Sequence, residues 1–146
     1  MTVRVQPGVF DPAMELAGFA QARHDIGAVV SFTGIVRDTK GDLDHMMIEH
    51  YPGMTERAIA GIVDQAVARW TLAEVLVIHR YGPLEPGVPI MMVATAAGHR
   101  AEAFAAADFL MDYLKSRAPF WKKEVTRDGE AWVAAKAADE QALKRW

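Results

Sequence analysis

A group of basic side chains near the C-terminal end is the strongest chemical signal in this sequence. Between Tyr113 and Arg127 the chain carries one acid, Glu124, and five basic residues: Lys115, Arg117, Lys122, Lys123 and Arg127. This window has a net charge of +4 in a chain whose total is −3. Like charges repel unless an anion binds among them, so the cluster predicts an anion site. A solvated helix end, where the helix dipole favours basic residues, is an equally good interpretation.

Apolar residues interrupt this basic window. Pro119, Phe120 and Trp121 lie between its lysines, and large apolar side chains are costly to leave in water. We therefore expect them to wall a pocket that has cations at its rim. In that pocket Phe120 and Trp121 would exclude water.

Two other stretches could contact an anion. His99 and Arg100 stand between an apolar strand and a long helix, where free N–H groups bind phosphate and an arginine adds a bidentate contact. Arg37 follows another strand. Its simplest interpretation is a surface ion pair with Asp38 or Asp42, and the alternative is a contact with an anionic ligand.

Several classes of function are disfavoured. The chain has no cysteine, which excludes thiolate zinc sites and a cysteine nucleophile, so any sulfur that it transfers must come from another molecule. His45 and His50 are five residues apart on an expected strand and would face opposite sides, so we expect no metal site. The small net charge argues against a nucleic-acid binder. No signal peptide or membrane span is expected, and the cytoplasm is the expected location.

The patterning predicts one domain over residues 1–146, because 51% of the residues are hydrophobic and nothing resembles a linker. Strands are expected at residues 2–5, 27–36, 45–51, 73–80, 90–97, 120–126 and 130–134, and helices at 12–23, 54–70, 99–117 and 138–146. This order predicts an α+β fold with helices packed mainly on one face of a mixed sheet. Trp146 is expected to be buried against another subunit.

Longer stretches of the sequence resemble the large, catalytic subunit of molybdopterin synthase. The resemblance rests on GAVVSFTGIVRD (27–38), IEHYPGMTERA (48–58), VIHRYGPLEPG (77–87), GHRAEAF (98–104), MDYLKSRAPFWKKE (111–124) and GEAWV (129–133). These stretches occur in the family's order and cover nearly the whole chain. The resemblance implies an α/β hammerhead fold.

The resemblance also implies a function. In this family a homodimer of large subunits binds two small ubiquitin-like sulfur carriers, making a heterotetramer. The carrier's C-terminal Gly-Gly ends in a thiocarboxylate, and two sulfurs pass to cyclic pyranopterin monophosphate to form the dithiolene of molybdopterin. No cofactor is implied. The family's catalytic lysines fall on Lys115 and Lys122. Its substrate-binding positions fall on Ile35, Val36, Arg37, His99, Arg100, Lys115, Lys122, Lys123 and Glu124.

The expected roles combine the resemblance with the residue chemistry. Arg37, His99 and Arg100 would hold the phosphate and the pterin. Lys115 would act beside the thiocarboxylate carbon, and Lys122 would transfer protons. Ile35 stands where some relatives carry a basic residue, which leaves the positioning of the substrate open. The alternatives are a non-catalytic anion- or nucleotide-binding module and a scaffold subunit that only dimerises and docks a partner.

Overall fold

The computed structural model describes residues 1–146. The strands are β1 (Thr2–Gln6), β2 (Ala28–Ile35), β3 (Leu43–His50), β4 (Leu72–Arg80), β5 (Gly82–Leu84), β6 (Pro89–Ala97), β7 (Phe120–Thr126) and β8 (Gly129–Trp132). The helices are α1 (Pro12–Gly18), α2 (Met54–Arg69), α3 (Arg100–Arg117) and α4 (Ala137–Ala142), which continues into a 3₁₀ turn at Leu143–Arg145. The expected α+β class is confirmed, and the elements follow the expected order except that β5 is an additional strand.

The strands form two sheets rather than the single mixed sheet that the sequence predicts. The first sheet has the order β1-β4-β6-β2 and is mixed, since β1 runs parallel to β4 and the other pairs are antiparallel. The second sheet is antiparallel and has the order β5-β3-β7-β8. Pairing partners far apart in the chain decide this division, and periodicity within a segment carries no information about them.

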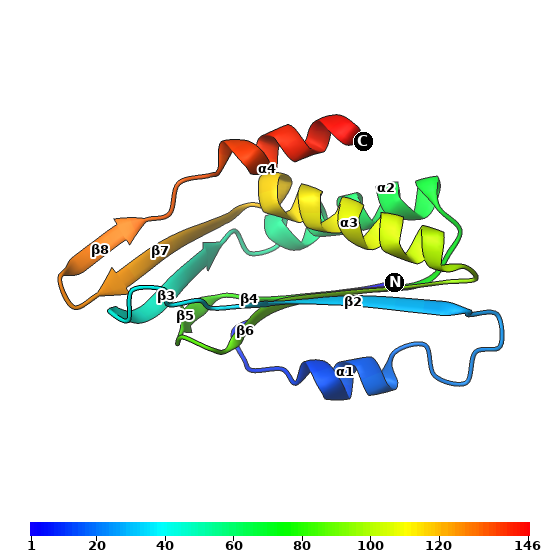
Figure 1. Ribbon diagram of the computed structural model, residues 1–146, viewed down its shortest axis with the longest axis horizontal. Helices are drawn as coiled ribbons and strands as arrows, with labels where there is room; N and C mark the ends of the chain where they lie inside the picture. The colour runs from blue at the N-terminus through cyan, green and yellow to red at the C-terminus, as the bar shows by residue number, and fades with distance from the viewer.

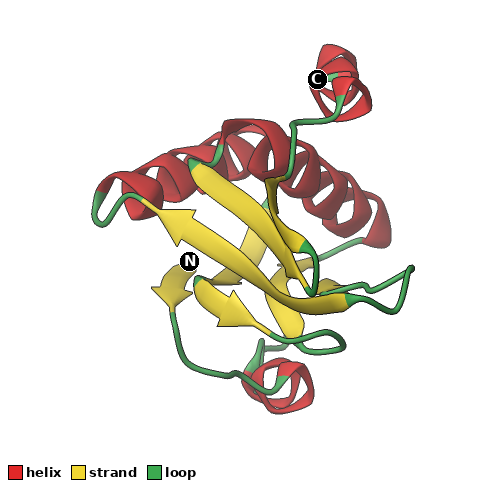
Figure 2. Ribbon diagram, turned by 90° about the vertical axis from the view of Figure 1, so that its left-hand side faces the viewer, coloured by secondary structure: helices red, strands yellow, loops and turns green.

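The first sheet lies between helices of unequal size (Figure 1). α2 and α3 cover one face, the short α1 lies on the other, and α4 packs against α3. The second sheet lies at the left of Figure 1, on the side where α3 ends. Figure 2 shows both sheets beneath the long helices. Ile59, Ile62, Val63 and Ala66 of α2 face the core with the spacing expected of an amphipathic helix. No helix is long and apolar enough to cross a membrane.

α1 begins as predicted and ends early. The side chain of Asp11 caps it by accepting hydrogen bonds from the backbone N–H of Ala13 at 2.9 Å and of Met14 at 3.4 Å. The sequence predicts a helix that reaches Arg23, but α1 ends at Gly18. Ala20 and Ala22 have φ angles of 62° and 56°, which a right-handed helix cannot contain.

The C-terminal tryptophan, expected at a subunit contact, packs against residues of its own chain and remains partly exposed. Its ring lies edge-on to Trp70 and to Phe109, with centroids 5.7 Å and 5.4 Å away. Its Nε1–H donates to Asp112 at 2.6 Å, and Arg145 beside it pairs with the same carboxylate at 2.6 Å. These contacts fasten the C-terminal segment onto α3.

Candidate functional site

Lys115 and Lys122 lie at the junction between the end of α3 and the start of β7. Lys115 is in the last turn of α3, and Lys122 is the third residue of β7. Burial lowers the pKa of the Lys122 ammonium group, and the nearby charge of Lys115 lowers this pKa further. The fold therefore brings the two lysines together, as the sequence analysis expects, and holds one of them away from water.

Aromatic and imidazole rings form a floor beneath Lys122. Phe120 is two residues before Lys122 and so projects to the same side of β7, where it faces His50 of β3 in register. The ring of Phe120 stacks on His79 of β4, with centroids 3.7 Å apart and an interplanar angle of 17°. His50 stacks in turn on Tyr81, at 3.9 Å. This ring floor, made of His50, His79, Tyr81 and Phe120, lies close enough to Lys122 for the lysine's charge to act on His79.

Two of the five basic residues in the window are already neutralised. Arg117 makes a bidentate ion pair with Glu140 of α4, with both N–O distances 2.7 Å. Lys123 pairs with Glu130 at 2.8 Å and lies 4.8 Å from the ring centroid of Trp132. Lys115, Lys122 and Arg127 make no ion pair. Arg127 lies in the turn between β7 and β8, so the two lysines are the cations that remain for an anionic ligand at this junction.

Trp121 does not share the wall that the sequence analysis assigns to it. Consecutive residues of a strand point to opposite faces, so Trp121 lies on the other side of β7 from Phe120 and Lys122. It is 44% exposed and contacts Tyr51 edge-on, with centroids 5.2 Å apart. Phe120 alone adjoins Lys122.

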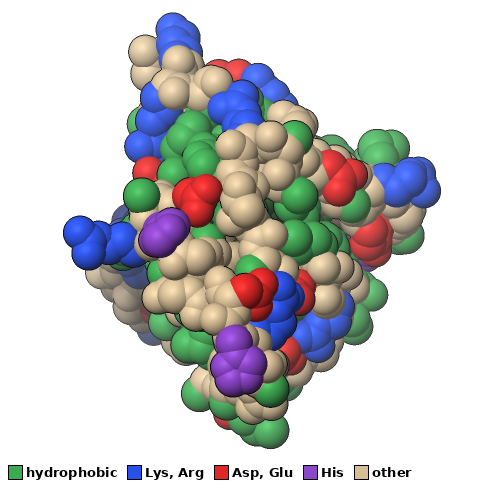
Figure 3. Space-filling view, turned by 90° about the vertical axis from the view of Figure 1, so that its right-hand side faces the viewer, with side chains coloured by type: hydrophobic (Ala, Val, Ile, Leu, Met, Phe, Trp, Pro, Cys, Tyr) green, Lys and Arg blue, Asp and Glu red, His purple; other side chains and the backbone are tan.

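His99 and Arg100 lie at the opposite end of α3 from Lys115. His99 is the N-cap residue, makes no capping hydrogen bond with its side chain, and is exposed together with Arg100. Arg100 and Lys115 are about 22 Å apart along the axis, because an α-helix rises about 1.5 Å per residue. Figure 3 faces the end where α3 begins and shows basic side chains interspersed with acidic and histidine side chains. Within one chain these residues do not converge with the lysine pair.

Arg37 lies at the same end of the first sheet as the lysine pair. Ile35 pairs with Pro89 of β6, and His79 pairs with Met91 of the same strand, so Arg37 and the ring floor are both near that end. Arg37 is exposed and makes no ion pair. The expected pair with Asp38 or Asp42 is wrong, because Asp38 instead accepts a hydrogen bond from the backbone N–H of Gly41 at 2.9 Å.

The other expected substrate-binding positions differ in how accessible they are to a ligand. Ile35 is 56% exposed, whereas the side chain of Val36 is buried in the core. The backbone N–H and C=O of Val36 bond to Val88 and Gly87, at 3.0 Å and 2.8 Å. Glu124 is exposed and lies on the same side of β7 as Lys122, two residues farther from α3. Val36 thus has no free group for a ligand, while Ile35 and Glu124 remain accessible.

Sequence reasoning missed the contribution of His79 and His50. Both stand at the ends of strands that the sequence predicts, but only the long-range pairing of β3 with β7 and the contact between the two sheets bring them beneath Lys122. The sequence offers the motif VIHRYG as a signal, since a histidine and an arginine interrupt an otherwise apolar strand. Lys136 and Asp139, near α4, also influence the pKa of Lys122, in opposite directions.

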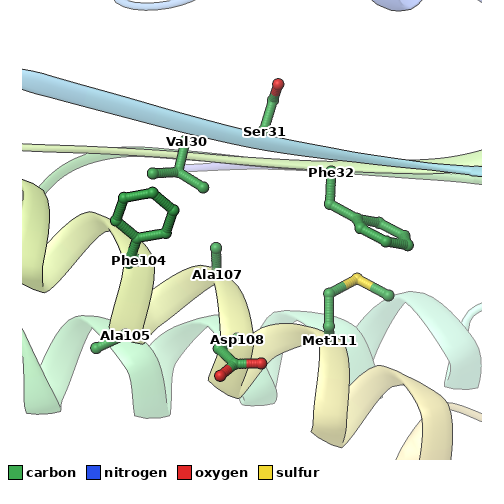
Figure 4. A pocket seen from close by; sticks show the side chains of 8 residues that line it. All are labelled: Val30, Ser31, Phe32, Phe104, Ala105, Ala107, Asp108 and Met111. Carbon is green, nitrogen blue, oxygen red and sulfur yellow. The ribbon is translucent and has the colours of Figure 1, made fainter.

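An exposed apolar hollow of ≈ 350 Å³ lies halfway along α3. Figure 4 shows Val30 and Phe32 of β2 pointing toward Phe104, Ala107 and Met111 of α3, while Ser31 points to the other face of the sheet. Phe104 is 62% exposed, and β2 is one of the two edge strands of the first sheet. An apolar surface beside an open sheet edge is typical of a contact with another chain.

Comparisons with known proteins show the family of this chain. The model of the MoaE protein family matches residues 5–117. This chain belongs to the MoaE protein family. The molybdopterin synthase catalytic subunit of Cereibacter sphaeroides is 65% identical over 146 residues, which is 100% of both chains. The structure of the molybdopterin biosynthesis MoaE protein from Burkholderia ambifaria has a TM-score of 0.85 and 49% identity, and the alignment covers 99% of this chain and 97% of that one.

A more distant structure supports the fold alone. It is a protein–protein complex of subunits 1 and 2 of molybdopterin-converting factor from Helicobacter pylori, with a TM-score of 0.79, 16% identity, and coverage of 92% and 91%. The MoaE relatives confirm the expected function, that of a molybdopterin synthase catalytic subunit. They also confirm the expected enzyme class, a sulfurtransferase of molybdenum cofactor biosynthesis.

Proposed function

We propose that this chain transfers sulfur from the C-terminal thiocarboxylate of a small ubiquitin-like carrier to cyclic pyranopterin monophosphate. The observation that carries this proposal is the unpaired couple Lys115 and Lys122, one of which is held in partly desolvated surroundings. The thiocarboxylate of the carrier and the phosphate of the pterin are both anionic, so the binding of either one offsets the repulsion between the lysines. The chain has no cysteine, which is consistent with sulfur that arrives on another protein.

The lysines act on charge and on protons. The thiocarboxylate sulfur forms a bond to the pterin, and water then cleaves the bond between this sulfur and the acyl carbon, which releases the carrier as a carboxylate. These steps pass through tetrahedral intermediates with negative charge. A fixed cation aimed at such charge contributes about 10²- to 10³-fold in rate. Lys115 supplies this stabilisation beside the thiocarboxylate carbon. Lys122, whose pKa is lowered, gives up and takes back a proton more readily at neutral pH than an exposed lysine does.

A second copy of the chain completes the site in this proposal. His99 and Arg100 are too far from Lys115 to act on the same phosphate within one chain. The apolar hollow lies around Ala107, midway between Arg100 and Lys115. A two-fold axis there runs the two copies of α3 antiparallel and places the first turn of one helix beside the last turn of the other. In this site Arg37 comes from the same copy as the two lysines.

The remaining expected substrate-binding positions have smaller roles. Ile35 and Glu124 border the substrate with their exposed side chains, and Lys123 borders it from the far face of β7. The side chain of Val36 supports the loop that carries Arg37 from within the core. One carrier binds to each copy, which makes a heterotetramer. The proposed location of the protein is the cytoplasm.

Formation of the dithiolene tests this proposal. The wild-type chain is mixed with thiocarboxylated carrier and cyclic pyranopterin monophosphate, and product is compared with that of Lys115→Ala and Lys122→Ala. We expect about 10²-fold losses or more in each variant. Lys144→Ala is the matched control, because Lys144 is exposed and makes no ion pair. Near-normal rates for both lysine variants would exclude the proposal.

A further inference from the structure

His79 is a buried imidazole that joins the two sheets. It belongs to β4 of the first sheet, is 5% exposed, and stacks on Phe120 of the second sheet. Its Nδ1 lies 2.8 Å from the carbonyl oxygen of Arg80, to which an Nδ1–H donates. The ring is thus held on one edge by its own strand and on one face by β7.

The stacked ring lies next to Lys122 because of the strand geometry. Phe120 and Lys122 are two residues apart and project to the same side of β7. Ile48 of β3, which is opposite Lys122 in register, is 1% exposed, so this side of the sheet faces the core. A ring that fixes Phe120 therefore also fixes the start of β7, and with it the distance from Lys122 to the end of α3.

The charge on His79 is consistent with this position. Burial lowers its pKa to about 3, and the nearby charges of Lys122, Lys115 and His50 act in the same direction. From the C-terminal segment, Lys136 and Asp139 act on Lys122 with opposite signs. The imidazole is neutral at physiological pH, so it adds no third positive charge to the lysine pair.

We propose that His79 is a positioning residue for sulfur transfer, which acts by stacking on Phe120 and so holding Lys122 beside Lys115 and away from water. This inference deepens the proposed function and rests on it. His79 does not touch the substrate in this account. Its effect passes through Phe120 to the backbone of β7.

Two variants separate the ring from its hydrogen bond. His79→Asn keeps a donor and loses most of the stacked surface, whereas His79→Phe keeps the ring and loses the donor. We expect kcat to fall about tenfold or more in His79→Asn and about threefold or less in His79→Phe, with KM for the pterin little changed. His45→Phe is the matched control, because His45 is a partly buried histidine of β3 in the second sheet and pairs with Asp44 outside the ring floor.

The pKa of Lys122 gives a readout that needs no substrate. It is measured from the ¹³Cε chemical shift in lysine-labelled protein as the pH is raised. We expect this pKa to rise toward its ordinary value in His79→Asn, because a looser β7 admits water, and to move less in His79→Phe. A folded His79→Asn variant with wild-type kcat and an unchanged Lys122 pKa would overturn the proposal.

A variant on the other side of the stack covers the case in which His79→Asn does not fold. Phe120→Leu removes the second ring, and we expect the same fall in kcat and the same rise in the pKa of Lys122. An unchanged pKa and an unchanged kcat in folded Phe120→Leu would also overturn the proposal. If the wild-type protein makes no dithiolene, the proposed function fails, while the lysine titration still decides whether His79 positions Lys122.

Discussion

Burial lowers the pKa of Lys122 on β7, and the charge of Lys115, in the last turn of α3, lowers this pKa further. The fold thus holds two ammonium groups near each other, neither of them in an ion pair, at a cost in folding free energy. Arg117 and Lys123, from the same stretch of chain, each have an acidic partner. A lysine with a lowered pKa and no ion-pair partner, such as Lys122, is typical of a functional site, where a ligand offsets the cost.

The repulsion between the lysines predicts a specific pKa shift. Lys115→Ala removes one of the causes that lower the pKa of Lys122, so this pKa should rise while burial still keeps it below the ordinary value. Titration of the labelled Lys122 by NMR checks the shift. Lys136→Ala should raise the same pKa by less, because its charge acts more weakly on Lys122. A Lys122 that titrates identically in wild type and Lys115→Ala would show that the two groups do not interact.

The same cost predicts that Lys122 is unfavourable for stability. A lysine whose folded pKa is lowered destabilises the folded state at neutral pH, and this penalty disappears as the pH rises through its folded pKa toward 10.5. Lys122→Met should therefore raise the free energy of unfolding at pH 7 by about 0.5–2 kcal/mol while it abolishes activity. Urea denaturation at pH 7 and at pH 10 measures the effect. The gain should shrink at the higher pH, and a loss of stability at pH 7 would contradict the account.

The lowered pKa of His79 predicts that the free energy of unfolding falls as the pH is lowered. Its pKa is about 3 in the folded state and 6.5 in the unfolded chain, so the unfolded state binds a proton that the folded state refuses between these values. Each pH unit below 6.5 should cost about 1.4 kcal/mol of stability from this group. Denaturation from pH 7 to pH 4 should show a steeper decline in wild type than in His79→Phe. Parallel curves would mean that His79 is protonated in the folded protein.

The packing of Trp146 predicts that the last residue stabilises the whole domain. Its ring contacts Trp70 and Phe109, and its N–H bonds to Asp112. Trp146→Ala should lower the free energy of unfolding by about 1–3 kcal/mol. Trp132→Ala is the control, since Trp132 is 57% exposed and should change stability by about 0.5 kcal/mol or less. Equal effects of the two substitutions would place Trp146 outside the core.

Local patterning predicts most of the elements of this fold. The apolar spacing of Ile59, Ile62 and Ala66 is sufficient for α2, and the Asp11-Pro12 pair is sufficient for the start of α1. The three residues of β5 lie in a stretch rich in glycine and proline that reads as a turn, and they become a strand only by pairing with Met46, Met47 and Ile48. The division into two sheets depends on such pairings and is invisible in any single segment.

The candidate site shows the same limit. The charge pattern is sufficient to single out Lys115 and Lys122, since basic residues cluster there in an otherwise acidic chain. The pattern does not show that Arg117 and Lys123 are neutralised, because Glu140 and Glu130 meet them only after folding. It also places His99 and Arg100 with the lysines, which the length of α3 rules out within one chain.

Mixing two inactive variants tests most directly whether the lysines of one copy work with His99 and Arg100 of another. Arg100→Ala and Lys122→Ala are prepared separately, each with little dithiolene formation, and then exchanged into mixed dimers. Phe104→Asp, which should disrupt the apolar hollow and the dimer, is the control that cannot be rescued by mixing. A mixed dimer has one site with both defects and one intact site, so mixing should restore about a quarter of wild-type activity. No recovery despite proven subunit exchange would contradict the account.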